Sequence, residues 1–261
     1  MGQGVVIEAI LKRDRLIVAG GLAALAALAW AYTLWLALGM QGGPMPITMA
    51  MPQPHGWTAV DFLLMLVMWD VMMVAMMTPA VTPVVLLVAA VNRQRAGGVG
   101  GGMSIAAFVA GYLLAWTGFS LAATVVQWGL HDQALLSNAM GEVGGWLGPA
   151  LLVAVGLYQL TPAKGLCIRH CRSPLQFLMT SWRPGPRGGL VMGLRHGLYC
   201  VGCCWALMAL LFVAGIMNIL WIAGLAALVL IEKLSGPGVW VGRLVGVLLI
   251  AWGVWLAWLA A

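Results

Sequence analysis

Charged side chains are scarce in this chain, and their scarcity decides its broad class. Of 261 residues only 8% are Asp, Glu, Lys or Arg, whereas 63% are hydrophobic. Soluble domains carry about 25% charged residues. With a mean hydropathy of +1.00, the chain lacks the polar surface needed to coat a soluble globule. The composition therefore predicts an all-α fold, a polytopic transmembrane helical bundle that forms one integral membrane domain over residues 1–261.

Motifs of common enzymes and of nucleic-acid-binding proteins are also missing. The sequence has no G-x-S-x-G elbow, phosphate-binding loop or H-E-x-x-H motif, and no helix-turn-helix or RNA-recognition signature. Its few carboxylates are too scattered to propose an acid–base pair. We therefore predict no catalytic residue and no nucleic-acid partner. The net charge of +6 comes from a few loop clusters, which we interpret as orientation signals.

Long apolar runs predict seven membrane-spanning helices. They lie at about residues 16–38, 59–90, 104–128, 144–160, 190–214, 217–231 and 239–259. The stretch 190–231 is longer than one bilayer crossing requires, so we expect a turn near Gly215–Asn218. A single span preceded by an interfacial helix would instead give six. Pro79 and Pro83 predict a kink late in the second span.

Basic residues are absent from two of the loops between these spans. The loops 39–58 and 129–143 contain no Lys or Arg, whereas the loop 161–189 contains several. Cytoplasmic loops of membrane proteins carry the excess of Lys and Arg. The N-terminus and the loop 161–189 are therefore expected in the cytoplasm. The lipid bilayer is the first partner that this topology implies.

Three thiols and an imidazole stand near the start of the fifth predicted span, in the segment His-Gly-Leu-Tyr-Cys-Val-Gly-Cys-Cys-Trp. At about 100° per residue, His196, Cys200 and Cys203 share one helical face, and Cys204 lies at its edge. Soft donors on one face favour a thiophilic metal such as Cu(I) or Zn(II), or a redox dithiol.

A second pair of cysteines lies in the loop assigned to the same side of the membrane. We expect Cys167 and Cys171 to face Cys200 and Cys203. A site of four thiolates can bind Zn(II), Cu(I) or an iron–sulfur cluster. The alternative is a set of reduced thiols without a metal, which the cytosolic redox potential permits.

The second predicted span contains many methionines and one deep aspartate. Asp70, Met73 and Met77 fall on one helical face, and a carboxylate with thioethers can hold or pass a cation. The alternative for Asp70 is a buried hydrogen bond to another span, and the alternative for the methionines is ordinary packing.

The preceding loop, residues 39–58, is rich in potential soft ligands and carries no charge. These ligands are Met40, Met45, Met49, Met51 and His55. Methionine with histidine is compatible with capture of Cu(I) outside the cell. An apolar loop lying on the membrane interface is an equally good interpretation.

Three segments together resemble a bacterial family called predicted metal-binding integral membrane proteins, an uncharacterised domain family. The first, Met68–Pro83, reads Met-Trp-Asp-x-Met-Met-x-Ala-Met-Met-x-Pro-x-x-x-Pro. The second, Tyr158–Pro174, begins with Tyr-Gln-Leu-Thr-Pro-x-Lys and contains the two cysteines that follow. The third, His196–Lys233, runs from the segment with His and three Cys to a Glu-Lys pair. The resemblance covers about residues 60–233. It implies helical spans, a bound metal and the bacterial inner membrane, but no established reaction.

Two functions of different class follow. The first is an integral membrane metal-binding protein, a transporter or membrane chaperone for Cu(I) or Zn(II), in which the Asp70 face passes the cation inward to the cysteines. A soluble metal carrier would be its partner. The second is an accessory or structural subunit of a larger membrane enzyme. Its cysteines would hold a structural metal or a redox centre, and its partners would be other membrane subunits.

The orientation can be tested at Ser173, in the middle of the basic loop. A reporter fused at this position is expected to report the cytoplasm, because the surrounding loop holds the excess of basic residues. Labelling of Ser173→Cys by an impermeant thiol reagent added outside intact cells would reverse the predicted topology.

Overall fold

All regular elements in the described part of the chain are helices. The computed structural model describes residues 2–40, 57–96, 101–133 and 145–259. The helices are α1 (Gly2–Met40), α2 (Ala59–Ala96), α3 (Gly101–Asp132), α4 (Leu147–Leu160), α5 (Pro162–Arg172), α6 (Pro174–Ser181), α7 (Gly185–Ala209), α8 (Leu211–Ala214), α9 (Ile219–Leu234) and α10 (Gly238–Leu259). The all-α prediction is confirmed.

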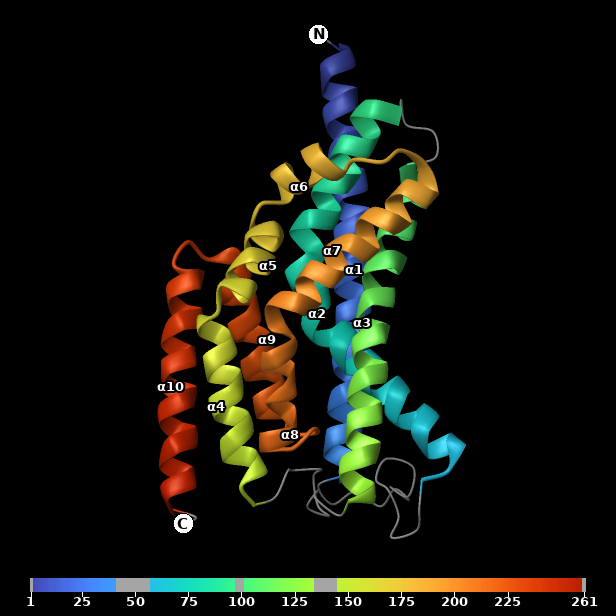
Figure 1. Ribbon diagram of the computed structural model, residues 1–261. Helices are drawn as coiled ribbons and strands as arrows, with labels where there is room; N and C mark the ends of the chain where they lie inside the picture. Colours follow the sequence, from blue (N-terminus) through green and yellow to red (C-terminus); the bar gives the residue numbers. More distant parts are fainter. Residues whose placement is uncertain (1, 41–56, 97–100, 134–144, 260–261) are drawn as a thin grey trace.

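Five of these helices are long and apolar enough to cross a membrane. They are α1, α2, α3, α10 and the helix formed by α7 with α8. Helices α4 and α5, which meet at a bend of 62°, would together make a sixth span. Helix α9 has 16 residues and is shorter than the 20 or so that a straight crossing needs. The chain nevertheless runs up and down the bundle through α4 and α9 as well (Figure 1). The count of seven spans stays a prediction.

Glycines set the distance between α3 and α7. A Cβ atom on Gly189 or Gly193 would collide with the backbone of α3 at Ser104 or Phe108, and one on Gly197 would meet Ala115. Small residues at a helix crossing allow two backbones to approach closely, which is how helices associate in a membrane. This seam holds α7, which carries three of the cysteines, firmly against α3.

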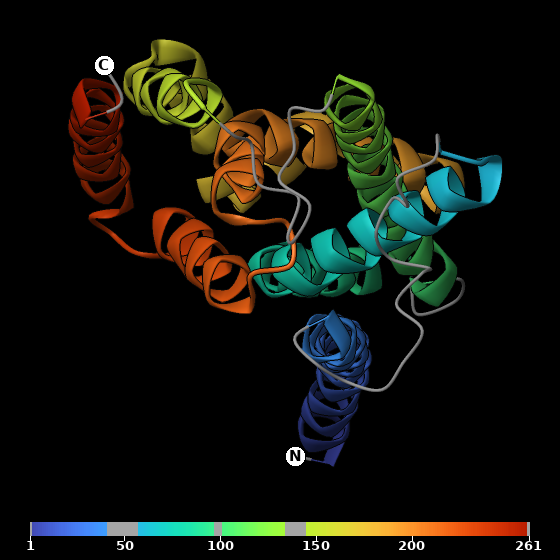
Figure 2. The ribbon, with the colours of Figure 1, turned by 90° about the horizontal axis from the view of Figure 1, so that it is seen from below.

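Helix α2 lies in the middle of the bundle and is buried on more than one side. It contacts α1, α3 and α9, and Figure 2 shows it between α1 and α3. Methionines on different sides of α2 are therefore in the core, with Met72 and Met73 fully buried. The indole nitrogen of Trp69 donates a hydrogen bond of 2.8 Å to Gln127 of α3. Packing, the alternative interpretation of these methionines, accounts for their burial.

The break between α7 and α9 has a local cause. Gly215 has a φ of 91°, a conformation that side chains other than glycine rarely adopt. Asn218 then caps α9, because its side-chain oxygen accepts a hydrogen bond from the backbone nitrogen of Trp221. The chain reverses here, so α9 runs back along the bundle towards the end that holds α5 and α6 (Figure 1).

The glycine seam can be tested with two matched substitutions. Gly193→Ala places a methyl group against the α3 backbone, whereas Gly224→Ala on α9 meets open space. Alanine favours helices over glycine by about 1 kcal/mol, so Gly224→Ala should leave the thermal midpoint in detergent unchanged or raised. Gly193→Ala should lower it, because overpacking costs about 1–3 kcal/mol. Equal midpoints for both variants would contradict the seam.

Candidate metal centre

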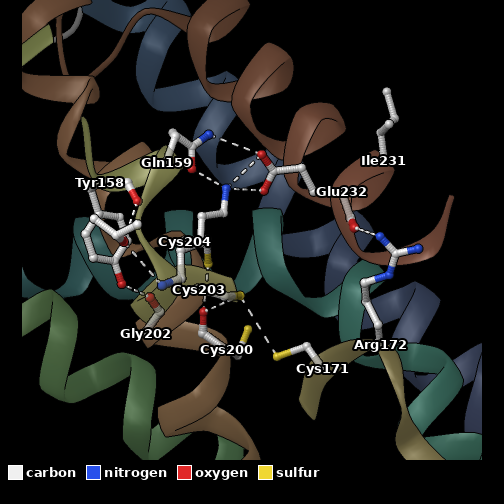
Figure 3. Close-up of polar contacts among 12 residues, drawn as sticks. Tyr158, Gln159, Cys171, Arg172, Cys200, Gly202, Cys203, Cys204, Ile231 and Glu232 are labelled. Atoms are coloured by element: carbon white, nitrogen blue, oxygen red, sulfur yellow. Dashed lines mark hydrogen bonds and ion pairs between the residues drawn. The ribbon is translucent and has the colours of Figure 1, made fainter. Parts of the chain in front are cut away.

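The five cysteines gather where α5 crosses α7. Cys200, Cys203 and Cys204 lie on α7, and all five thiols are free. Cys171 of α5 points at these residues, as Figure 3 shows. Four of the five are buried, and Cys167 is partly exposed. Cys171 and Cys200 are 29 positions apart in sequence, yet α5 and α7 bring their sulfurs into one cluster.

Cys171 and Cys203 form a close sulfur pair between α5 and α7. Their Sγ atoms are 3.9 Å apart. If both bound one ion at about 2.3 Å, as in thiolate complexes of zinc, the angle at the ion would be about 116°. This angle lies between trigonal and tetrahedral geometry. The spacing therefore fits two sulfurs that share a single metal ion.

The other two cysteines of the predicted set lie differently. Cys204 is as deeply buried as Cys203, although the helical wheel places it at the edge of the face. Its thiol donates to the backbone oxygen of Cys200 at 2.9 Å, and the thiol of Cys203 donates to the same oxygen at 3.1 Å. Cys167 lies against Gly202, where a Cβ would come within 2.9 Å of its sulfur.

Cys200 has two polar partners from other helices. The ammonium of Lys233 on α9 lies 2.8 Å from its Sγ, and the hydroxyl of Tyr112 on α3 lies 3.0 Å away. The same hydroxyl donates to the backbone oxygen of Met77 at 3.4 Å. Because a hydroxyl carries one proton, the ammonium of Lys233 is the partner suited to stabilise a thiolate at Cys200.

His196 lies one helical turn before Cys200, in an aromatic environment. Its ring is 5.2 Å from Phe177 and 6.1 Å from both Phe108 and Tyr112, measured between ring centres. The side chain is buried, and its Nδ1 atom has no hydrogen-bond partner. An unpaired buried nitrogen is costly, and binding a metal or a proton donor would relieve that cost. His196 thus brings an unpaired nitrogen to the helix face that carries Cys200, and its role as a ligand stays a prediction.

Asp70, Met73 and Met77 do not join the centre as a set. Met77 reaches it through its backbone oxygen and Tyr112, whereas Met73 is packed in the core. Asp70 lies seven residues before Met77, about 10 Å along α2. It is partly buried. Its carboxylate is thus separate from the cysteines, and its polar role stays a prediction.

The structure shows a second polar cluster that the sequence reasoning missed. Lys164 of α5 forms a buried ion pair with Glu232 of α9, at 2.7 Å, and also bonds to Gln159 of α4. The amide nitrogen of Gln159 donates to the same carboxylate at 3.1 Å, as Figure 3 shows. One signal in the sequence could have revealed this cluster: ionisable residues stand beside apolar helices. Burying such residues in a membrane is costly unless they are paired. In the sequence, Lys164 and Lys233 stand out as basic residues and as parts of the family segments, without a partner for either.

Arg172, the last residue of α5, connects this helix to the end of α9. Its guanidinium donates to the backbone oxygens of Glu232, Ser235 and Gly236, at 3.3, 2.7 and 2.9 Å. These oxygens lie at the C-terminal end of α9, where carbonyl groups lack helical partners. Arg172 thereby holds the end of α5, and Cys171 with it, beside α9.

A metal site with three or more preformed ligands is not present in residues 2–40, 57–96, 101–133 and 145–259. No three His, Cys, Asp or Glu side chains there are placed to hold one ion. The Cys171–Cys203 pair satisfies the geometry of two ligands, and further donors would have to turn toward it.

The histidine and most of the methionines of the loop 39–58 lie outside the described residues.

The comparison with protein families gives the class of this protein. A family model described as copper chaperone, PpoB2, matches residues 66–256. The match covers most of the chain, and the protein belongs to this copper chaperone family. The matched segment contains all five cysteines, His196 and Lys233. No curated protein and no solved structure matches the chain.

The ion pair between Lys164 and Glu232 can be tested by a double-mutant cycle. Lys164→Met and Glu232→Met each leave one buried group without its partner, which should cost about 3–5 kcal/mol of unfolding free energy. The double variant removes both charges and should recover most of that loss. Unfolding in detergent micelles measures the three values. A double variant whose loss equals the sum of the single losses would contradict the coupling.

Proposed function

We propose that the protein is a membrane-embedded chaperone that binds Cu(I) between the thiolates of Cys171 and Cys203, with Cys200 as the adjacent third sulfur. One observation carries this proposal: two buried sulfurs from different helices stand 3.9 Å apart in a member of a copper chaperone family. Soft thiolate ligands favour Cu(I) over hard cations. Copper is here the cargo of the protein.

The surroundings of the pair support a chaperone more than a catalyst. Helices α5 and α7 shield the sulfurs from water, since the Cys171 and Cys203 side chains are both buried. Such burial protects a bound cuprous ion from water and oxidants. Cys204 and Cys167 add two more soft donors for Cu(I) on the same two helices.

The methionines of α2 are the proposed loading route. Met73 and Met77 share a helical face with Asp70, and both methionines are buried. The backbone oxygen of Met77 contacts Tyr112, itself the partner of Cys200. In the predicted orientation this route begins at the outer face, after the methionine-rich loop, and ends at the cysteines. Asp70 would neutralise the cation during passage.

Delivery would take place at the end of the bundle that carries α5 and α6. Helix α6 and the N-terminus lie at this same end (Figure 1). Cys167, the partly exposed thiol, is placed to pass the ion to a soluble metal carrier or to another membrane subunit. In the orientation predicted by the basic residues, this end faces the cytoplasm of a bacterial cell.

An accessory subunit of a membrane enzyme is the second candidate, and one feature favours it. An apolar cleft of about 830 Å³ lies between α3, α4 and α7. Its walls carry small residues, among them Ala115 and Gly118 of α3 and Ala150 and Ala154 of α4. Small residues allow a further helix to pack closely. Large side chains at Gly118 and Ala154 should then dissociate a partner subunit without changing metal content.

The copper site can be tested by substituting the cysteines singly. Cys171→Ser and Cys203→Ser should each remove most of the Cu(I) bound by the purified protein, because each deletes one of two sulfurs. Cys204→Ser is the matched control on the same helix and should do less, because its thiol is engaged with the backbone oxygen of Cys200. Elemental analysis after anaerobic loading gives the copper content per protein.

The thermal midpoint of each serine variant shows whether it is folded. Loss of copper from Cys204→Ser alone, with Cys171→Ser and Cys203→Ser unaffected, would place the metal elsewhere. Full copper content in all three folded variants would exclude the cysteine site.

A further inference from the structure

A cavity with charged walls lies beside the bend between α4 and α5. It has a volume of about 360 Å³, and the first two turns of α10 close it. Helices α4 and α10 contact each other along the bundle (Figure 1). The walls carry the cations of Lys164, Arg169 and Arg243 and the carboxylate of Glu232. Lys164 and Glu232 neutralise each other as an ion pair. The two arginines thus leave the cavity positively charged, which favours an anionic ligand.

These two arginines have no carboxylate partner among the residues that the structure describes. Arg169 belongs to α5 and Arg243 to α10, and both are exposed. The guanidinium of Arg243 lies over the ring of Trp240, 5.2 Å from its centre. Two segments distant in sequence therefore bring arginines to one cavity. A guanidinium binds the oxygens of a phosphate group through paired hydrogen bonds.

The ion pair forms the inner wall of the cavity and does not attract the ligand itself. Both oxygens of Glu232 accept bonds from Lys164, at 2.8 and 2.7 Å, and Gln159 donates a third bond to this carboxylate. Gly242 keeps the space next to the pair open, since a Cβ there would lie 2.8 Å from Oε1 of Glu232. An anion is therefore expected at the arginines, away from the carboxylate that would repel it.

The place of the cavity in the bundle indicates where its ligand comes from. Helix α10 begins at Gly238 and is long and apolar enough to cross a membrane, so its first turns lie at one face of the bilayer. Trp240 is exposed in these turns, and tryptophans are enriched at the membrane–water interface. Leu160, Leu166 and Val239 line the same cavity and are exposed apolar residues. Arginines beside exposed apolar side chains at this depth match the phosphate and the acyl chains of a phospholipid.

We propose that this cavity binds the phosphate headgroup of an anionic phospholipid, and that Arg169 and Arg243 contact the phosphate. Free inorganic phosphate has the same chemistry, but the exposed apolar residues at the cavity favour the lipid. Basic cavities between membrane helices recognise anionic headgroups in this way. None of the five cysteines, all of them within the described ranges, lines the cavity. The site therefore goes beyond the proposed copper function and does not depend on it.

The test counts lipids bound to the full-length protein by native mass spectrometry. The protein in a neutral detergent receives an equimolar mixture of phosphatidylglycerol, which is anionic, and phosphatidylcholine with the same acyl chains, which is zwitterionic. The wild type should prefer phosphatidylglycerol. Arg169→Gln and Arg243→Gln should each reduce that preference about fivefold, the usual contribution of one basic residue to binding of an anionic lipid.

Two further variants separate the site from general surface charge. Arg187 is also exposed, in the first turn of α7, but it does not line the cavity. Arg187→Gln removes the same charge and should leave the preference unchanged. The double variant Arg169→Lys with Arg243→Lys keeps both charges and should prefer phosphatidylglycerol more than either glutamine variant does. It also serves if a glutamine variant does not fold.

The outcomes decide both the site and its ligand. A reduced preference confined to Arg169→Gln and Arg243→Gln supports the inference. A wild type without preference, or the same reduction with Arg187→Gln, would overturn it. An excess of inorganic phosphate should leave phosphatidylglycerol bound to the wild type. Displacement of the lipid by inorganic phosphate would show that free phosphate is the ligand, and the assignment to a phospholipid would be wrong.

Discussion

A charge buried in an apolar helical bundle needs an opposite charge or hydrogen bonds, and this requirement organises the centre of the protein. Two adjacent residues of α9 meet it in opposite ways. Glu232 is neutralised by Lys164 from α5, and Lys233 is directed at the sulfur of Cys200 on α7. Helix α9 thereby binds α5 and α7 together through polar contacts, where apolar side chains alone would leave their relative position loose.

The bend between α4 and α5 turns this requirement into a site. Thr161 ends α4 and caps α5, because its side chain accepts a hydrogen bond from the backbone nitrogen of Lys164. After the bend, one short helix supplies Lys164 to Glu232, Cys171 to Cys203 and Arg172 to the end of α9. The sulfur pair and the ion pair are therefore positioned by the same element. A change that loosens α5 would disturb both.

The sequence predicted the part of the site that depends on helical periodicity. His196, Cys200 and Cys203 lie on one face because the angle per residue is a property of every α-helix. The approach of Cys171 followed from the same topology that places its loop beside α7. Lys233 and Tyr112 escaped prediction, because each reaches Cys200 from a helix distant in sequence, by 33 and 88 positions. Asp70 was grouped with Met77 by periodicity, yet only Met77 touches the residues around the cysteines.

The sequence by itself determined the all-α class and the membrane-spanning character of the long helices, because hydropathy and length are sums over neighbouring residues. It also determined which residues could serve as soft ligands. Only the tertiary structure decided which of them meet, and which charge faces which group. Those decisions depend on the glycine seam between α3 and α7 and on the bend before α5. Lys164 pairs with Glu232, and Lys233 contacts the thiol of Cys200. Each contact joins side chains that are far apart in sequence, so no local pattern encodes it.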